Sequence, residues 1–196
     1  MDHNTQPQNQ AYNTILRQKY ARDDQWITDF LTHAQIGHIA THWENQPFIT
    51  PLIFWFEPEK KAIYFHTNVQ GRLIENCTRY PEGCFETCEM GKLLPSNAAK
   101  NFGMQYASVV AFGKIFQLTD EEEKRYGLMG LLNKYFPDLK VSVDYRPILQ
   151  KELDITAVLR FDIESWSGKK NWKEHSQQIP EWQELEESVL KKYLKQ

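Results

Sequence analysis

The chain has 196 residues, of which 41% are hydrophobic and 13% aromatic, so it can bury a substantial core and is not a disordered chain. Its net charge of −3 and pI of about 6.1 argue against a nucleic-acid-binding surface. No apolar run reaches the roughly 18–20 residues of a membrane helix. The polar start MDHNTQPQNQ lacks the apolar region of a signal peptide. We therefore expect a cytoplasmic protein without nucleic-acid or membrane partners, with a polar tail over residues 1–20 and a single domain over 21–196.

The cysteines Cys77, Cys84 and Cys88 lie close together in the sequence. Zinc sites usually contain CxxC pairs or nearby histidines at ligand spacing, and neither occurs here. We expect three reduced thiols, with Cys84 and Cys88 on one face of a strand, and no metal site.

The first half of the chain predicts one helix followed by strands. Apolar residues recur at helical spacing over 23–34, with Asp23 or Asp24 as the N-cap. Residues 36–43 and 48–56 form a predicted hairpin, and the turn EPEKK leads to a strand over 62–66. These patterns predict three antiparallel strands in a row.

The second half alternates helices and strands. Helices are predicted over 72–80, from the capping-box pattern at 119–122 to Phe136, and over 180–194; strands are predicted over 84–90, 107–117 and 155–166. The apolar stripe of the middle helix is predicted to be Tyr126, Met129, Leu132 and Phe136. Six mostly antiparallel strands indicate a mainly β (α+β) fold, a closed or partly closed barrel with peripheral helices.

The strand QPFITPLIFWF is apolar at nearly every position, which predicts burial of both faces, yet Pro51 lies in its middle. Proline cannot donate to a β-ladder, so it indicates a strand edge or a bulge. The N–H groups of residues 52–54 then need partners, which a second subunit or a planar ligand rich in acceptors would supply. A bulge satisfied within the chain is the alternative.

The stretch IYFHTNVQGRLIENC predicts a strand that ends at His66-Thr67 and a helix that begins near Gly71-Arg72. A helix N-terminus offers free N–H groups, and a guanidinium suits bidentate contact with phosphate. The corner is therefore a candidate anion site, or simply a packed strand-to-helix corner. Similarly, WSGKKNW (166–172) places cations between tryptophans, which suits either a flat anionic ring or packing at a domain edge.

Four separated segments together resemble one family, the FMN-binding split-barrel proteins related to pyridoxamine 5′-phosphate oxidase, and within it the nitroimidazole-resistance-type (Nim-like) flavoproteins. The resemblance runs from about Ile36 to Trp172 and rests on IGHIATHWENQPFITPLIFWF, IYFHTNVQGRLIENCTRYPEGCFE, YASVVAFGKI and FDIESWSGKK. It implies a six-stranded antiparallel split β-barrel that forms a homodimer with two flavin sites at the interface.

The resemblance also implies a set of FMN-contacting residues: the strand backbone at Thr50, Pro51, Leu52, Ile53 and Phe54, the phosphate corner of His66, Thr67 and Arg72, and further Ser108, Trp166 and Lys169. Leu73 stands where the family often has a lysine, so a second cation would come from Lys169 or Lys170. The arginine-rich C-terminus of the true oxidases is not reproduced by KKNWKEHSQQ, which argues against pyridoxamine phosphate as the substrate.

The leading hypothesis is an FMN-dependent oxidoreductase that moves electrons from NADH or NADPH to a small or aromatic acceptor, with His66 as a catalytic proton relay. The alternative is a non-enzymatic flavin- or haem-binding sensor or storage protein, for which His38, His42 and His175 are candidate axial ligands. A third hypothesis, suggested by Leu73, is an interaction protein that keeps the barrel without the cofactor.

Overall fold

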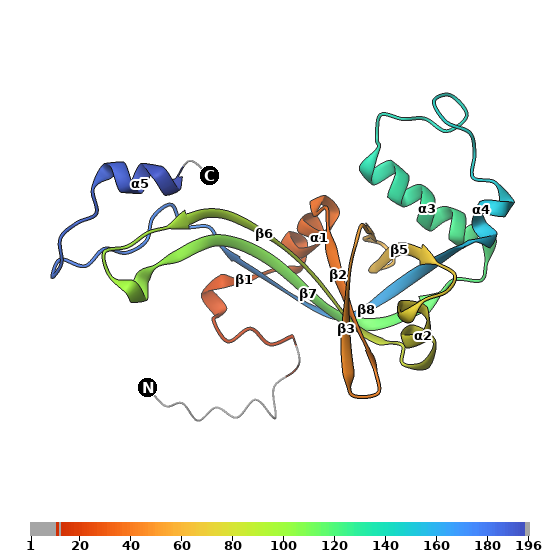
Figure 1. Cartoon of the computed structure of the whole chain (residues 1–196), viewed down its shortest axis with the longest axis horizontal. Helices are drawn as coiled ribbons and strands as arrows, with labels where there is room; N and C mark the ends of the chain where they lie inside the picture. The colour runs from red at the N-terminus through yellow and green to blue at the C-terminus, as the bar shows by residue number, and fades with distance from the viewer. Residues whose placement is uncertain (1–10, 12, 195–196) are drawn as a thin grey trace.

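The computed structural model describes residue 11 and residues 13–194, the last without its side chain. Its main element is one antiparallel sheet (Figure 1), which confirms the predicted mainly β split-barrel architecture. The strands are β1 (Ala21–Arg22), β2 (Gly37–Trp43), β3 (Gln46–Leu52), β4 (Trp55–Glu57), β5 (Ala62–Asn68), β6 (Glu82–Leu94), β7 (Gly103–Gln117) and β8 (Thr156–Asn171).

The sheet has eight strands rather than six, in the order β3-β2-β6-β7-β8-β5-β4, with β1 paired to β8. The predicted strand over 48–56 is divided at Ile53-Phe54, so its first part pairs with β2 and its second with β5. The expected row of three neighbouring strands is therefore wrong. Because β3 and β4 are at opposite ends of the sheet and only two residues apart in sequence, the sheet must curl until its ends nearly meet.

Three long strands, β6, β7 and β8, continue beyond the barrel as an arm (Figure 1). β7 pairs with β6 from Glu82↔Lys114 to Leu94↔Gly103 and with β8 from Tyr106↔Asn171 to Gln117↔Leu159. The stretch WSGKKN is part of β8 rather than a segment that follows it. On β6, Cys84 and Cys88 share the outward face as expected, opposite Phe112 and Ser108 of β7.

Helix α1 (Asp24–His33) closes one end of the barrel. The Asp23 carboxylate accepts a hydrogen bond from the Trp26 N–H, which confirms the predicted cap. Ile27 and Leu31 are buried in the main core, together with Phe54, Phe85 and Phe161 of the sheet.

Helix α3 (Glu121–Tyr135) packs on the outside of β4 and β5 through glycines. A Cβ atom at Gly130 would lie 2.0 Å from Cε3 of Trp55, and one at Gly127 would lie 2.7 Å from Cδ1 of Tyr64. The predicted stripe of Tyr126, Met129, Leu132 and Phe136 is wrong as the buried face. Gly127, Gly130 and Leu131 are the buried residues, because only a side with no bulk allows the helix to approach these two aromatic rings.

The remaining helices are α2 (Arg72–Arg79), α4 (Gln150–Asp154) and α5 (Glu187–Leu194), with short 3-10 helices at Gln18–Tyr20 and Ala99–Asn101. The helix expected to begin at Pro180 begins at Glu187 instead. The preceding residues bind the connection between β6 and β7, where Asn97 Oδ1 accepts the N–H of Ile179 and Ser96 donates to the carbonyl of Gln177.

Across the described part of the chain, no helix combines the length and apolarity that a membrane crossing requires. The same residues contain no group of three or more His, Cys, Asp or Glu side chains arranged to hold a metal ion. The three cysteines are free thiols, and burial raises the pKa of Cys77 to about 12, which leaves it protonated at neutral pH.

Candidate functional site

The barrel is split between β3 and the segment from His66 to Arg72. Ile53, just after β3, and His66 line the same pocket, whereas the Arg72 guanidinium lies 5.7 Å from the ring centre of Phe48 near the other end of β3. The segment therefore runs beside β3 in the opposite direction, without pairing to it. We call this gap the split; its walls are residues 48–53 and 66–72.

Strand β3 pairs with β2 alone among the described strands, with Pro51 opposite His38. Pro51 thus lies on an edge strand, as its missing N–H requires. The expected burial of both faces is wrong for the single chain, because Ile49 is 70% exposed and Pro51 is also exposed. Thr50 and Leu52 are half-buried on the opposite face of β3, the face that they share with Phe48.

Tyr135, the last residue of α3, fixes the link between β3 and β4. Its hydroxyl oxygen accepts the N–H of the buried Phe54 at 3.1 Å and lies 2.5 Å from the carbonyl oxygen of Gln35. The N–H of Phe54 is therefore satisfied within the chain, as the bulge alternative supposes. Lys134 lies over the Phe54 ring, with Nζ 3.7 Å from the ring centre. Burial lowers the pKa of Lys134 to about 8, and this Nζ has no hydrogen-bond partner among the described residues.

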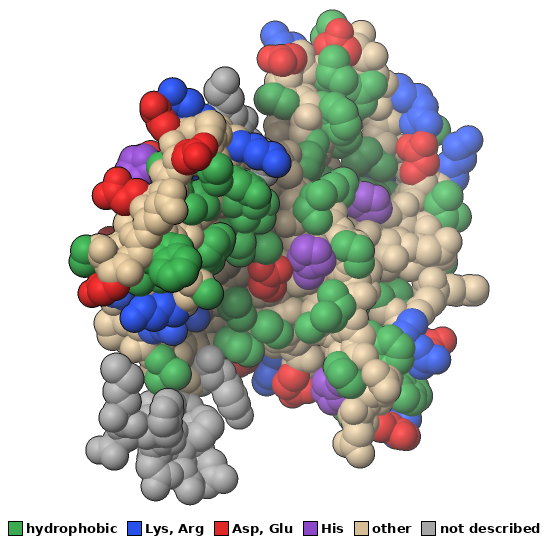
Figure 2. Space-filling view, turned by 60° about the vertical axis from the view of Figure 1, so that its left-hand side comes forward, with side chains coloured by type: hydrophobic (Ala, Val, Ile, Leu, Met, Phe, Trp, Pro, Cys, Tyr) green, Lys and Arg blue, Asp and Glu red, His purple; other side chains and the backbone are tan. Residues whose placement is uncertain are grey.

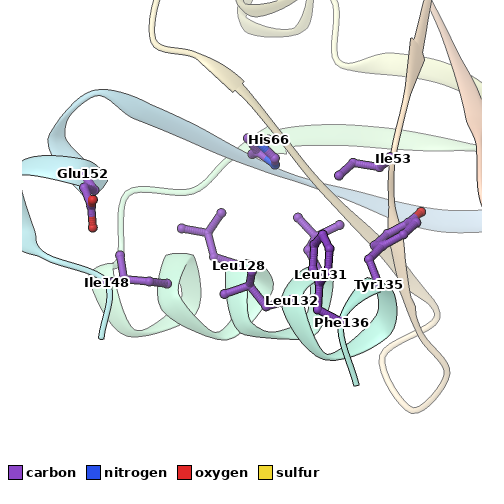
Figure 3. Close-up of a pocket in the computed structure, with 9 residues that line it drawn as sticks. All are labelled: Ile53, His66, Leu128, Leu131, Leu132, Tyr135, Phe136, Ile148 and Glu152. Atoms are coloured by element: carbon purple, nitrogen blue, oxygen red, sulfur yellow. The ribbon is translucent and has the colours of Figure 1, made fainter. Parts of the chain in front are cut away.

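A cavity of about 320 Å³ opens at the Ile53 end of the split (Figure 3). His66 and Ile53 face the leucines of α3 across it, and Glu152 of α4 lies at one side. Its lining is mostly apolar: Ile53, His66, Leu128, Leu131, Leu132, Tyr135, Phe136, Ile148 and Glu152. Such a lining suits a flat, largely apolar ring.

His66 and Glu152, two titratable groups of this cavity, have fixed charge states at neutral pH. Desolvation lowers the pKa of His66 below 6.5, so the imidazole is neutral at pH 7. One ring nitrogen can then donate a hydrogen bond and the other can accept one. Hydrogen bonds from Arg146 and from the Leu149 N–H lower the pKa of Glu152 to about 2, so it is a carboxylate. The cavity therefore combines a neutral imidazole with one anion that is already paired.

The Arg72 end of the split carries positive charge. Helix α2 begins after Gly71, whose φ of 141° is accessible to glycine but strained for other residues, and no side chain caps its first N–H groups. Arg72 stacks 5.1 Å from the ring centre of Trp43 and forms an exposed ion pair with Glu75 at 3.2 Å. Thr67, half-buried at the end of β5, lies between this corner and the cavity.

Arg79 is a cation that sequence reasoning missed. Its guanidinium lies 5.0 Å from the ring centre of Trp43, the ring that Arg72 also contacts. The spacing of seven residues on one helix, which places both side chains on one face, was the available signal. Leu73 is buried at 9% exposure and belongs to the main core. A charged group at that position would point into the barrel rather than toward the split.

Ser108, Trp166 and Lys169 lie elsewhere in the single chain. Lys169 of β8 pairs with Ser108 of β7. His66 pairs with Val158 of β8, which is eleven residues from Lys169, a strand length of roughly 35 Å. The Trp166 Nε1–H donates to Asp24 at 2.8 Å, and Lys61 lies 4.7 Å from its ring centre. The single chain therefore brings residues 50–54, His66, Thr67 and Arg72 close together. Ser108, Trp166 and Lys169 lie away from them.

The three histidines considered as haem ligands are also separate. His38 Nδ1 lies 3.0 Å from Glu86 on the outward face of the sheet, and His42 stacks on Tyr80 with ring centres 4.6 Å apart. His175 is exposed near the end of the arm.

A sequence model of the family described as pyridoxamine 5′-phosphate oxidase matches residues 23–170. The chain belongs to this family. The match covers α1, the whole barrel and most of the arm, and therefore includes every wall of the split. A search of curated proteins finds no match.

Solved structures share this fold at low sequence identity. The flavocytochrome Anf3 from Azotobacter vinelandii is 24% identical, with a TM-score of 0.71 over 86% of this chain and 76% of that one. An FAD and haem binding protein from Mycobacterium smegmatis is 17% identical, with a TM-score of 0.72 over 81% and 76%. A candidate 5-nitroimidazole antibiotic resistance protein from Bacteroides thetaiotaomicron is 23% identical, with a TM-score of 0.63 over 76% and 84%.

Proposed function

We propose that the protein binds FMN in the split and acts as an oxidoreductase that passes electrons from a reduced nicotinamide nucleotide to a small or aromatic acceptor. The observation that carries the proposal is the arrangement along β3: an apolar cavity at Ile53 and His66, and an arginine beside an uncapped helix start at Arg72. Family membership and flavin-binding structural relatives support it.

The residues of the split fit the two ends of such a cofactor. Arg72 and the first N–H groups of α2 would hold the phosphate, and Arg79 adds a second cation near the same Trp43 ring. The backbone of Thr50 to Ile53 and the cavity beyond it would hold the ring. FMN, when bound, supplies the electron transfer itself.

The neutral His66 imidazole carries a proton on one ring nitrogen and can take up a proton on the other. It would orient the acceptor by an N–H hydrogen bond and relay a proton, one ring nitrogen taking a proton from solvent as the other passes its proton to the acceptor. The apolar wall of Leu128, Leu131 and Leu132 would exclude water and select an aromatic acceptor.

A homodimer is the proposed assembly, because it would cover exposed apolar residues and bring distant site residues together. Ile49 and Met90 are 70% and 62% exposed on the outward side of the sheet. Figure 2 shows hydrophobic side chains on both sides of a hollow on one face of the molecule. Ser108, Trp166 and Lys169 of a second copy would then be available to the split of the first.

The visible spectrum of the purified protein tests the proposal. We expect flavin absorption, or its appearance when FMN is added, and oxidation of NADH or NADPH that depends on an aromatic acceptor. A protein that stays colourless with added FMN contradicts the flavin assignment. A Soret band in place of flavin peaks would favour the haem alternative, and bound flavin without nicotinamide oxidation would favour a sensor.

A further inference from the structure

A second cavity, of about 510 Å³, lies near the far end of the arm. Its walls come from the segment around the first 3-10 helix, from the connection between β6 and β7, and from the end of β8. Tyr106 and Asn171, which pair across β7 and β8, line it. Asn171 is thirteen residues along β8 from Val158, the partner of His66, or roughly 40 Å of strand, so this cavity is separate from the split of the same chain. We call it the distal pocket.

The distal pocket is strongly positive. Its lining includes Arg17, Lys19, Lys100 and Lys173 and no Asp or Glu residue. The whole chain has a net charge of −3, so a cavity lined by four cations has a charge of opposite sign to that of the protein as a whole. Like charges that surround a shared space repel one another, and an anion in that space would relieve the repulsion.

These four cations have no carboxylate partner among the described residues. The nearby Lys92 is paired with Glu174 at 3.9 Å, whereas none of the four forms an ion pair within the described ranges. Lys19 Nζ lies 5.0 Å from the ring centre of Tyr20, so its contact is with an aromatic face. Scattered surface lysines usually alternate with acids, and this set does not.

The pocket also offers groups that recognise a ring. Tyr20 and Tyr106 lie with ring centres 6.4 Å apart, tilted by 59°. The Asn171 Nδ2 donates to the Met104 carbonyl at 3.3 Å, while its Oδ1 is buried and has no hydrogen-bond partner among the described residues. Aromatic faces and an amide beside a positive rim suit a base and a phosphate in the same molecule.

We propose that the distal pocket binds a phosphorylated ligand of the nucleotide class, with the lysines and Arg17 on the phosphates and the tyrosines against the base. This proposal is independent of flavin binding in the split. The site is assigned by the juxtaposition of unpaired cations with Tyr20, Tyr106 and Asn171.

Isothermal titration calorimetry with ADP as the probe tests this proposal, on the full chain with and without FMN. We expect ADP to bind in both cases. The double variant Lys100→Ala/Lys173→Ala should bind ADP at least about tenfold more weakly, because it loses two charge-assisted contacts. Lys192→Ala, which removes an exposed lysine of α5 outside the pocket, is the matched control and should bind like the parent. Both pocket lysines are exposed, so the double variant should fold, which circular dichroism checks.

Adenosine and pyrophosphate separate the two parts of the ligand. We expect each to bind more weakly than ADP. Equal binding of pyrophosphate and ADP would overturn the nucleotide class, and absence of ADP binding at millimolar concentration would overturn the site. Loss of FMN uptake in the double variant would assign the pocket to the flavin, and loss of ADP binding in Arg72→Ala alone would place ADP in the split; either result overturns the proposal.

Discussion

The hydroxyl oxygen of Tyr135 lies 3.1 Å from the backbone nitrogen of Phe54 and 2.5 Å from the carbonyl oxygen of Gln35. One side chain at the end of α3 thus ties together the link between β3 and β4 and the approach to β2. These are the points where the two ends of the sheet meet, so this hydroxyl secures the closed end of the split.

Replacing Tyr135 with phenylalanine should destabilise the protein. The variant leaves the buried Phe54 N–H without a partner, which costs about 1–3 kcal/mol of unfolding free energy. Urea denaturation measures this loss. Tyr145→Phe is the control, since the Tyr145 hydroxyl has no hydrogen bond among the described residues. Equal stability of the two variants would contradict the assigned role.

Replacing Arg72 with alanine should weaken FMN binding by roughly tenfold to a hundredfold, the effect of about 1.5–3 kcal/mol for a hydrogen bond to a charged group. Riboflavin, which lacks the phosphate, should bind the variant and the parent equally. Fluorescence quenching of each flavin provides the measurement, with Lys191→Ala on α5 as the charge control. An equal loss for riboflavin would show that Arg72 contacts the ring or supports the fold instead.

His66 should titrate below pH 6.5 in the folded protein, because burial disfavours the imidazolium. The unfolded chain then binds the proton first as the pH falls, so His66 stabilises the fold above pH 6.5 and this contribution is lost as the pH drops through the folded pKa. Proton NMR of the imidazole gives the midpoint. His66→Gln should remove this part of the acid sensitivity and slow acceptor reduction, whereas His33→Gln, outside the cavity, should leave acceptor reduction unchanged.

Lys134 should produce a pH dependence of the same sign at alkaline pH. Burial lowers its pKa from 10.5 to about 8, so between these values the unfolded chain holds more protons than the folded one. The unfolding free energy therefore rises with pH across this window. The difference between the parent and Lys134→Met, measured from pH 8 to 10, should show this slope, because the subtraction cancels other titrating groups. The exposed Lys140→Met serves as the control. A flat difference would refute the assignment.

The sequence predicts the order and type of most elements because their hydrophobic periodicity is local. The corner at His66 to Arg72 is a case in point, since a strand, a glycine and a helix follow one another within one short stretch. The packing face of α3 was missed because Gly127 and Gly130 carry no hydrophobic signal, and their role depends on Tyr64 and Trp55 in distant strands. The cavity was missed for a related reason: its wall residues Ile53, Leu131 and Glu152 come from three separate parts of the chain.

The length of the arm was also missed. The sequence predicts strands over 84–90 and 107–117, with a long loop at 91–103 between them, whereas β6 extends to Leu94 and β7 begins at Gly103. Gln105 explains part of this extension, because its side chain accepts the N–H of Lys92 and donates to the carbonyl of Lys173. Long-range hydrogen bonds of this kind leave no periodic pattern in the sequence.

The walls of the split are joined at one end only. At Ile53-Phe54 the backbone itself connects β3 to β4, and Tyr135 secures it, whereas at the other end β3 begins at the turn of a hairpin, with Arg72 contacting Phe48 near its start. The backbone thus joins the two walls of the split beside the cavity, whereas beside Arg72 the walls meet only through side chains. A ligand with a longer tail would be accommodated by extending past the hairpin, while the space for its ring stays the same.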